Sequence, residues 1–274
     1  MIVELILFMV SVLPVFLIGM FTYKKDRQKE PAKLLVKLFL GGMGSCFLVL
    51  VISLILGLIF PIFSADAKDL NLIELIIHVF IGVALVEEFC KWIMAYKISY
   101  NDKDFDELYD AILYCVFVAL GFACFENLVY VYKNGIGTGL VRAILAVPGH
   151  ACDGMFMGYY LGLSKLGSLN NRNDIKVKNL VLSIIVPTIT HGIYDYCLFA
   201  ENVIFIVIFF IFVICMYIYV LKKIGKISAI NRKMKYKDNY CPNCGHIVDG
   251  NFCPVCGRKN EWERFGYLIS ESFF

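Results

Sequence analysis

Residues 203–220 read VIFIVIFFIFVICMYIYV and hold no charged side chain. An apolar run of about 20 residues can cross the roughly 30 Å hydrocarbon core of a bilayer as a helix. Similar runs recur along the chain, which is 59% hydrophobic and 18% charged, with a mean hydropathy of +0.72. The sequence therefore predicts a multi-pass membrane protein in contact with the lipid bilayer and excludes a soluble enzyme. The net charge of only +3 also argues against a nucleic-acid partner.

The predicted fold is all-α, a polytopic membrane bundle of about seven transmembrane helices. No segment alternates with a period of two residues, so helices are favoured over a barrel. The expected spans cover residues 2–21, 34–60, 71–96, 108–131, 138–164, 179–199 and 202–221. Lys and Arg gather in the first, third and fifth loops and after the last span. This bias predicts a cell-membrane protein with its N-terminus outside and its C-terminal tail in the cytoplasm.

The C-terminal tail carries two CxxC pairs, which predict a zinc ribbon. Two such knuckles together supply four thiolates for a tetrahedral Zn²⁺ site. A reducing cytoplasm disfavours disulfides, and so short a segment needs a metal in order to fold. Four thiolates leave no open coordination position, so this structural zinc points to docking of a cytoplasmic protein partner or to regulation. The predicted ligands are Cys241, Cys244, Cys253 and Cys256, with His246 as a loop residue between the pairs.

These features predict four segments. We expect a membrane domain over residues 1–225, a basic linker over 226–238, the zinc ribbon over 239–258 and a tail over 259–274. The residues that suggest chemistry all lie between positions 75 and 200 of the membrane domain.

Four consecutive predicted spans contain ionisable or strongly polar side chains. Such residues are costly inside a membrane and usually face a bundle interior, where they are paired and functional. The set therefore predicts a buried polar site. Its members are Glu87, Glu88, Lys91, Glu126, Asn127, His150, Asp153, His191 and Asp195.

Helical spacing suggests how the first three of these residues interact. At about 100° per residue, Lys91 falls between Glu87 and Glu88, one turn further along the helix. Lys91 can then neutralise one carboxylate, and the other can serve as a general base that activates water. Judged from the ends of the spans, Glu126 lies closer to the outer membrane face than Glu87. Whether Glu126 reaches the same site is open at this stage.

Each of the two histidines in these spans has a carboxylate close by in sequence. His191 and Asp195 are spaced i,i+4, and His150 and Asp153 are spaced i,i+3, so each pair lies on or near one helix face. Imidazoles held in this way could bind a metal or donate hydrogen bonds to an oxyanion. We expect Pro148-Gly149 to break the fifth span just before His150.

Structural interpretations stand beside these functional ones. Glu87 and Lys91 could simply join helices, and Glu126-Asn127 could form hydrogen bonds between helices. His78 stands alone in its span and is interpreted as structural, and Asp110 as a marker of the membrane interface. Seven further cysteines in apolar runs are interpreted as packing residues: Cys46, Cys90, Cys115, Cys124, Cys152, Cys197 and Cys215.

Four motifs, in order on successive spans, together resemble the PrsW family. They are EExxK (from Glu87), FxxxEN (from Phe122), a lone histidine (His150) and HxxxD (from His191). That family comprises bacterial membrane proteases distantly akin to the CAAX prenyl proteases. The resemblance covers roughly residues 75–200 and implies proteolysis of a membrane-anchored protein substrate. The family's best-known role would be the first cleavage of an anti-sigma factor in envelope-stress signalling.

The mechanism and the function class each have alternatives. His150 and His191 could bind a catalytic divalent metal with one open position, while Glu126, Asn127 and Asp195 position or coordinate. A metal-free mechanism would use a glutamate base, with the histidines and Asn127 as donors to the oxyanion. Beyond proteolysis, the intramembrane charges could belong to an ion-coupled transporter, or the chain could be a non-catalytic scaffold that presents the ribbon.

Overall fold

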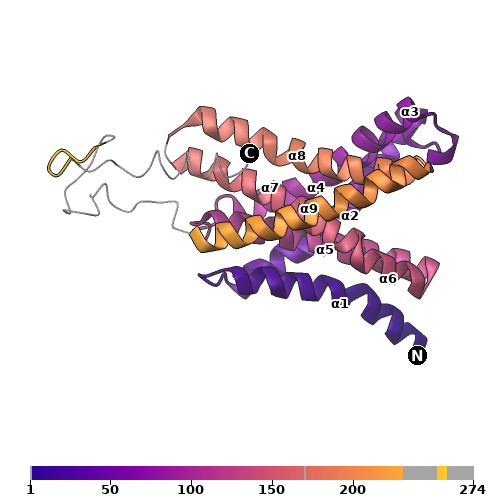
Figure 1. Cartoon of the computed structure of the whole chain (residues 1–274), viewed down its shortest axis with the longest axis horizontal. Coiled ribbons are helices and arrows are strands. Elements are labelled where there is room, and N and C mark those ends of the chain that lie inside the picture. The colour runs from indigo at the N-terminus through magenta and orange to yellow at the C-terminus, as the bar shows by residue number, and fades with distance from the viewer. Residues whose placement is uncertain (1, 170, 231–251, 258–274) are drawn as a thin grey trace. The chain divides into compact units, whose positions relative to one another are not determined.

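The computed structural model describes residues 2–169, 171–230 and 252–257 (Figure 1). Two compact units are present, residues 1–234 and 235–274. The helices of the first unit are α1 (Ile2–Lys25), α2 (Ala32–Ile59), α3 (Leu72–Ile77), η3 (His78–Leu85), α4 (Val86–Ser99), α5 (Leu108–Asn134), α6 (Ile136–Ile144), α7 (Ala146–Leu169), α8 (Asn173–Phe199) and α9 (Val203–Ile230). Two short 3-10 turns, η1 (Pro61–Phe63) and η2 (Ala67–Asp69), connect α2 to α3.

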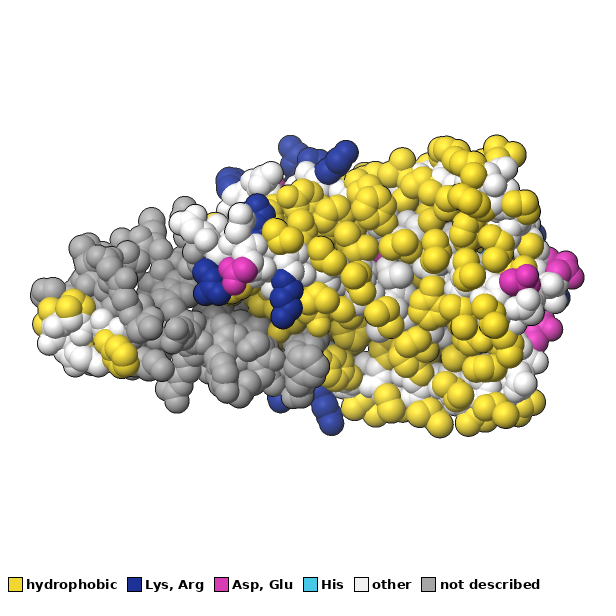
Figure 2. Space-filling model, turned by 90° about the horizontal axis from the view of Figure 1, so that it is seen from above, with side chains coloured by type: hydrophobic (Ala, Val, Ile, Leu, Met, Phe, Trp, Pro, Cys, Tyr) yellow, Lys and Arg dark blue, Asp and Glu magenta, His cyan; other side chains and the backbone are white. Residues whose placement is uncertain are grey.

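The helices confirm the predicted all-α membrane bundle. Among the described residues, α1, α2, α5, α8 and α9 are long and apolar enough to cross a membrane. Figure 2 shows the broad apolar surface of the bundle, with Lys and Arg side chains gathered towards one end of it. The other two predicted spans hold ionisable residues, and each is divided among several helices: residues 71–96 among α3, η3 and α4, and residues 138–164 between α6 and α7. The count of seven spans therefore stays a prediction.

Helix α5 is the central helix of the bundle and packs against α1, α2, α4, α6 and α7. Its contact with α7 depends on three glycines spaced four residues apart, Gly154, Gly158 and Gly162. A Cβ atom at Gly158 would lie 2.4 Å from the carbonyl oxygen of Ala111 on α5. Small residues at this spacing let membrane helices approach backbone to backbone. The close contact fixes α7, which carries His150, against α5, which carries Glu126.

A second close crossing joins α2 to α5. A Cβ atom at Gly42 would lie 2.0 Å from the carbonyl oxygen of Val118, and one at Gly121 would lie 2.0 Å from that of Phe39. Each helix therefore presents a glycine to the backbone of the other. Gly121 is one residue before the FxxxEN motif, so this crossing also positions that motif.

Two local features of the backbone lie next to the polar residues. η3 is a π-helix that widens the turn immediately before Glu87, and π-helical segments occur frequently at functional sites. The fifth predicted span is broken at Leu145, between α6 and α7. The expected break at Pro148-Gly149 is therefore misplaced by a few residues. Pro148 lies in the first turn of α7, where a proline's missing N–H costs little.

Candidate active site

Glu87, Glu88 and Lys91 form a buried ion-paired cluster at the start of α4. The Lys91 Nζ atom lies 2.7 Å from Oε1 of Glu88 and 3.2 Å from Oε2 of Glu87. Lys91 and Glu88 are almost wholly buried, whereas the Glu87 side chain keeps 12% of its surface exposed. One ammonium thus faces two carboxylates, as the helical spacing predicted. Of the two glutamates, Glu87 is the one with access to a substrate or to water.

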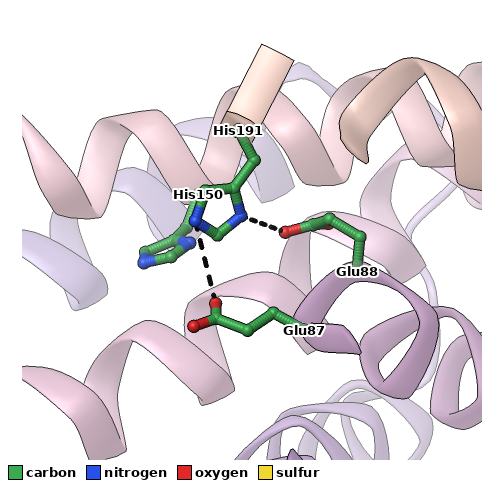
Figure 3. Close-up of side chains that lie close together, drawn as sticks. All are labelled: Glu87, Glu88, His150 and His191. Atoms are coloured by element: carbon green, nitrogen blue, oxygen red, sulfur yellow. Dashed lines mark hydrogen bonds and ion pairs between the residues drawn. The ribbon is translucent and has the colours of Figure 1, made fainter. Parts of the chain in front are cut away.

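His191 on α8 completes the contact between α8 and α4. Its Nδ1 atom lies 2.8 Å from Oε1 of Glu88, and its Nε2 atom lies 3.9 Å from Oε2 of Glu87 and 3.3 Å from Oδ2 of Asp195. Figure 3 shows Glu88 and Glu87 each pointing towards a different nitrogen atom of the His191 ring. The imidazole therefore lies between carboxylates on both of its nitrogen atoms. The i,i+4 pairing of His191 with Asp195 is present as expected.

His150 on α7 links Glu126 to this cluster. Its Nε2 atom lies 3.0 Å from Oε2 of Glu126, and its Nδ1 atom lies 3.3 Å from Nζ of Lys91. Phe122, the aromatic residue of the FxxxEN motif, places its ring 3.9 Å from Lys91 Nζ and edge-on to the His150 ring. Through His150, Glu126 therefore lies in the same cluster as Glu87. The positions of the predicted span ends had left open whether these two glutamates share one site.

Arg142 on α6 is a site residue that the sequence analysis missed. Its Nη2 atom lies 2.7 Å from Oε2 of Glu126, and its Nε atom donates to Oδ1 of Asn127 at 2.8 Å. Asn127 in turn donates through Nδ2 to the backbone oxygen of Ser11 on α1. Asn127 therefore links helix α1 to Arg142, and Arg142 in turn pairs with Glu126. An arginine inside an otherwise apolar stretch was the signal in the sequence that could have revealed this role.

The hydrogen-bond partners of Asp153 and His78 are not members of the candidate active site. Asp153 accepts a hydrogen bond from Thr190 Oγ1 on α8, the residue before His191, and so binds the neighbouring helix. The carboxylate on Nε2 of His150 belongs to Glu126 instead. His78 Nδ1 lies 2.8 Å from the carbonyl oxygen of Ile62, which fits its structural interpretation.

Four of these residues have the donor set and spacing of a metal site. Glu87, Glu88, His150 and His191 each offer one ligand atom, and these atoms all lie within 4.8 Å of one another. Glu88 Oε2 is buried without a hydrogen-bond partner among the described residues. A buried carboxylate oxygen is normally satisfied, and a cation would satisfy this one. Imidazole and carboxylate ligands together suit Zn²⁺ or a related divalent ion. The residues therefore fit a metal.

Within the predicted zinc ribbon, the structure describes residues 252–257, which include the second CxxC pair. Cys253 and Cys256 flank a turn in which the Gly257 N–H donates to the carbonyl oxygen of Cys253 at 2.9 Å, with Gly257 at a φ of +68°. Only glycine adopts that backbone conformation readily, which explains the glycine after the second cysteine. Cys241 and Cys244 lie outside the described residues, so the ribbon and its zinc stay predictions.

The fold and this cluster together define a multi-pass membrane hydrolase of the carboxylate–histidine class. Over residues 30–221 the chain matches the family described as PrsW family intramembrane metalloprotease. It is 33% identical to Protease PrsW of Oceanobacillus iheyensis over 81% of this chain and 97% of that protein. It is 33% identical to Protease PrsW of Clostridioides difficile over 84% of this chain and 95% of that one. It is 32% identical to Protease PrsW of Bacillus subtilis over 67% of this chain and 78% of that protein. No solved structure matches the chain significantly.

The chain belongs to the PrsW family of intramembrane metalloproteases. It is therefore a membrane peptidase that acts on a membrane protein substrate, and the transporter and scaffold alternatives are set aside. The matched residues include every member of the candidate active site. The CxxC pairs fall outside them.

Proposed function

We propose that the chain is a metal-dependent endopeptidase with Glu87 as its general base and with Glu88, His150 and His191 as its metal-binding residues. The observation that carries this proposal is the convergence of these four side chains from α4, α7 and α8 on one buried point. A divalent metal bound there supplies a Lewis acid that lowers the pKa of water and polarises the scissile carbonyl. The family's description as a metalloprotease supports this choice.

Glu87 is suited to move protons because it is the more accessible glutamate and is only loosely held by Lys91. In the proposed reaction its carboxylate takes a proton from the attacking water and later delivers it to the nitrogen of the leaving amine. Lys91 offsets the negative charge of the two neighbouring carboxylates. Glu88 is wholly buried: its Oε1 atom orients His191 through Nδ1, and its Oε2 atom, which has no hydrogen-bond partner among the described residues, is left for the metal.

The remaining polar residues position the histidines. Glu126 orients His150 through Nε2, as Glu88 orients His191 through Nδ1. Asp195 lies 3.3 Å from the Nε2 atom of His191. Arg142 balances the charge of Glu126, which would otherwise be a half-buried carboxylate beside neutral imidazoles. Contacts of this kind behind metal-binding histidines fix the orientation of the ring and the nitrogen that carries the proton.

A metal-free glutamate mechanism is the second candidate. Lys91 Nζ lies within 3.3 Å of atoms of Glu87, Glu88 and His150, so the site already holds a positive charge at its centre. In that mechanism the imidazoles would donate hydrogen bonds to the oxyanion.

Metal content separates these two mechanisms. We expect the purified full chain to hold two zinc ions, one in the ribbon and one at the cluster, and His191→Ala to hold one. Elemental analysis of both proteins, folded and in the same detergent, measures the difference. Equal metal content in the two proteins would favour the metal-free mechanism.

We propose a single-span membrane protein as substrate, and an anti-sigma factor as its class, because the four motifs resemble those of PrsW proteases. New protein N-termini are compared in membranes from cells that express the wild type, Glu87→Gln or Asp69→Asn at matched levels. Asp69 is an exposed carboxylate in η2 and serves as the control. Termini produced by the wild type and Asp69→Asn, and lost with Glu87→Gln, would identify the substrate. Identical termini from all three would refute the role of Glu87.

We also propose that the N-terminus lies outside the cell and that the ribbon faces a cytoplasmic partner. The alternation of Lys and Arg between loops supports this orientation. Reporter fusions in the predicted loops test it, with cytoplasmic reporters active after residues 29, 101 and 171. Activity of an external reporter at these positions would reverse the orientation.

A further inference from the structure

Three buried carboxylates meet far from the candidate active site, where the α1–α2 loop contacts the start of α5. Asp26, Glu107 and Asp110 are each at most 3% exposed, and one oxygen from each lies within 4.8 Å of the others. Glu126 follows Asp110 by 16 residues on α5, so the two groups are separated by about 24 Å along the helix. This second cluster is therefore distinct from the catalytic one.

The hydrogen bonds of this cluster leave oxygen atoms for a ligand. Asp26 Oδ1 accepts from the backbone N–H of Gln28 at 3.1 Å, and Asp110 Oδ2 accepts from that of Glu107 at 2.6 Å. The second oxygen of each aspartate, Asp26 Oδ2 and Asp110 Oδ1, is buried without a hydrogen-bond partner in the described parts of the chain. Buried polar atoms without a partner are rare in native proteins and require an explanation. A bound cation is such an explanation.

The charged groups around the cluster also favour a bound cation. Glu30, a fourth carboxylate, lies in the same loop and accepts a hydrogen bond from Tyr114 on α5. The nearby cation Lys29 directs Nζ to the backbone oxygens of Tyr23 and Asp26, at 2.6 and 2.7 Å. Buried charges in proteins are usually paired or coordinate metals, because burying an isolated charge is very costly.

We propose that Asp26, Glu107 and Asp110 bind a hard divalent cation of about the size of Ca²⁺. The donors are all oxygen atoms, which Ca²⁺ and Mn²⁺ accept and which soft metals do not prefer. Ca²⁺ binds oxygen at about 2.3–2.6 Å, so ligands on opposite sides of it are about 4.6–5.2 Å apart. Three oxygens that all lie within 4.8 Å of one another can therefore share one Ca²⁺ ion. Mg²⁺ usually keeps several waters and is bound through one or two carboxylates, so a site of three buried carboxylates suits Ca²⁺ better.

The proposed cation would join the α1–α2 loop to the first turn of α5. Asp26 comes just after α1, while Glu107 and Asp110 begin the central helix that also carries Glu126. Its role would be structural: it would hold the end of α1 against the start of α5 and would take no part in the reaction.

Equilibrium binding of ⁴⁵Ca²⁺ to the purified full chain, after removal of metal with a chelator, tests this proposal. We expect one Ca²⁺ per chain, competed by Mn²⁺, and a rise in Tm of roughly 5–10 °C at a 100-fold excess over Kd. Asp26→Asn and Asp110→Asn should weaken binding at least tenfold and abolish the Tm shift. Asp104→Asn, which removes a charge from the same α4–α5 loop outside the cluster, and His191→Ala should bind like the wild type.

Two results would overturn the proposal. One is the absence of Ca²⁺ binding by the folded wild type, which would mean that these carboxylates are neutralised by protons and not by a metal ion. The other is equal binding by the wild type, Asp26→Asn and Asp104→Asn, which would indicate nonspecific attraction to acidic loops. If Asp110→Asn fails to fold because it caps α5, Asp26→Asn decides the test, since asparagine can still accept from Gln28.

Discussion

Nδ1 of His191 lies 2.8 Å from Oε1 of Glu88, and this contact joins α8 to α4 across 103 residues of sequence. The contact is possible because Gly192 lets Phe80 of η3 lie against α8, where a Cβ atom would be 2.5 Å from the phenyl ring. A further hydrogen bond, from Trp92 Nε1 to Ser183 Oγ at 2.9 Å, joins the same two helices. The HxxxD motif therefore requires the glycine beside its histidine as well as the two polar residues that define it.

Removal of Lys91 should cost both stability and activity. In Lys91→Met the carboxylates of Glu87 and Glu88 lose the ammonium that lies 3.2 and 2.7 Å from them. Breaking a buried ion pair from one side typically costs about 3–5 kcal/mol. We expect a clear fall in thermal stability in detergent and no detectable cleavage. Lys97→Met, at an exposed position on the same helix, is the control and should leave both unchanged. A fully stable Lys91→Met would show that the two carboxylates do not need its charge.

Substitution of Arg142 should affect catalysis through Glu126. Arg142→Gln removes the ion pair to Glu126, and we expect the cleavage rate to fall by about tenfold or more at constant protein level. Arg142→Lys should recover only part of that loss, because lysine cannot reproduce the two directed contacts of a guanidinium. Lys133→Gln, an exposed change near the end of α5, provides the comparison. Full activity of Arg142→Gln would make Arg142 a packing residue only.

Gly158 should tolerate no side chain. In Gly158→Ala the new methyl group would meet the backbone of α5 at Ala111 and Ile112, at 2.4 and 2.5 Å. Neither neighbour is a flexible side chain that could move aside, so we expect a loss of about 1–3 kcal/mol in thermal unfolding experiments. Gly44→Ala on α2 meets nothing within 4 Å and should be neutral or slightly stabilising. Equal stability of the two variants would mean that the α5–α7 contact adapts easily.

Glu30 should make stability depend on pH. Burial raises the pKa of this loop carboxyl from 4.5 to about 7, although the hydrogen bond from Tyr114 opposes the rise. Between these values the folded chain holds a proton that the unfolded chain releases. Stability should therefore be highest below pH 4.5 as far as this group is concerned, and should fall as pH rises to 7, by at most about 1.4 kcal/mol per pH unit.

The measurement for Glu30 is thermal unfolding across this pH range in cation-free buffer. Glu30→Gln should remove the part of the slope that belongs to this carboxyl, while Asp69→Asn should retain it. An unchanged slope in Glu30→Gln would assign the pH dependence to other groups.

Much of the site could be predicted from the sequence, because ionisable residues are expensive in a membrane and stand out against apolar spans. Helical periodicity placed Lys91 against both glutamates and Asp195 beside His191, since these contacts lie within one helix. Contacts between helices could not be predicted in this way. Asp153 has the right spacing for His150, yet the crossing of α7 and α8 turns it towards Thr190.

The residues that sequence reasoning missed share one cause. Arg142 lies on α6 within the fifth predicted span, and it was not singled out because its partners Glu126 and Asn127 lie on another helix, α5. Asp110 was interpreted as a marker of the membrane interface because Asp26, which lies in the same carboxylate cluster, is 84 residues away in the sequence. In both cases the relevant neighbour is distant in sequence, and only the packing of helices brings the pair together.

The three glycines of α7 also limit how a substrate reaches the catalytic residues. Because the backbones of α5 and α7 touch at Gly154, Gly158 and Gly162, no polypeptide can slip sideways from the lipid between these two helices. His150 lies one helical turn before Gly154, the first of these three glycines. A membrane protein substrate must therefore approach Glu87 from another side of the bundle, so the contact between α5 and α7 restricts the direction of substrate entry.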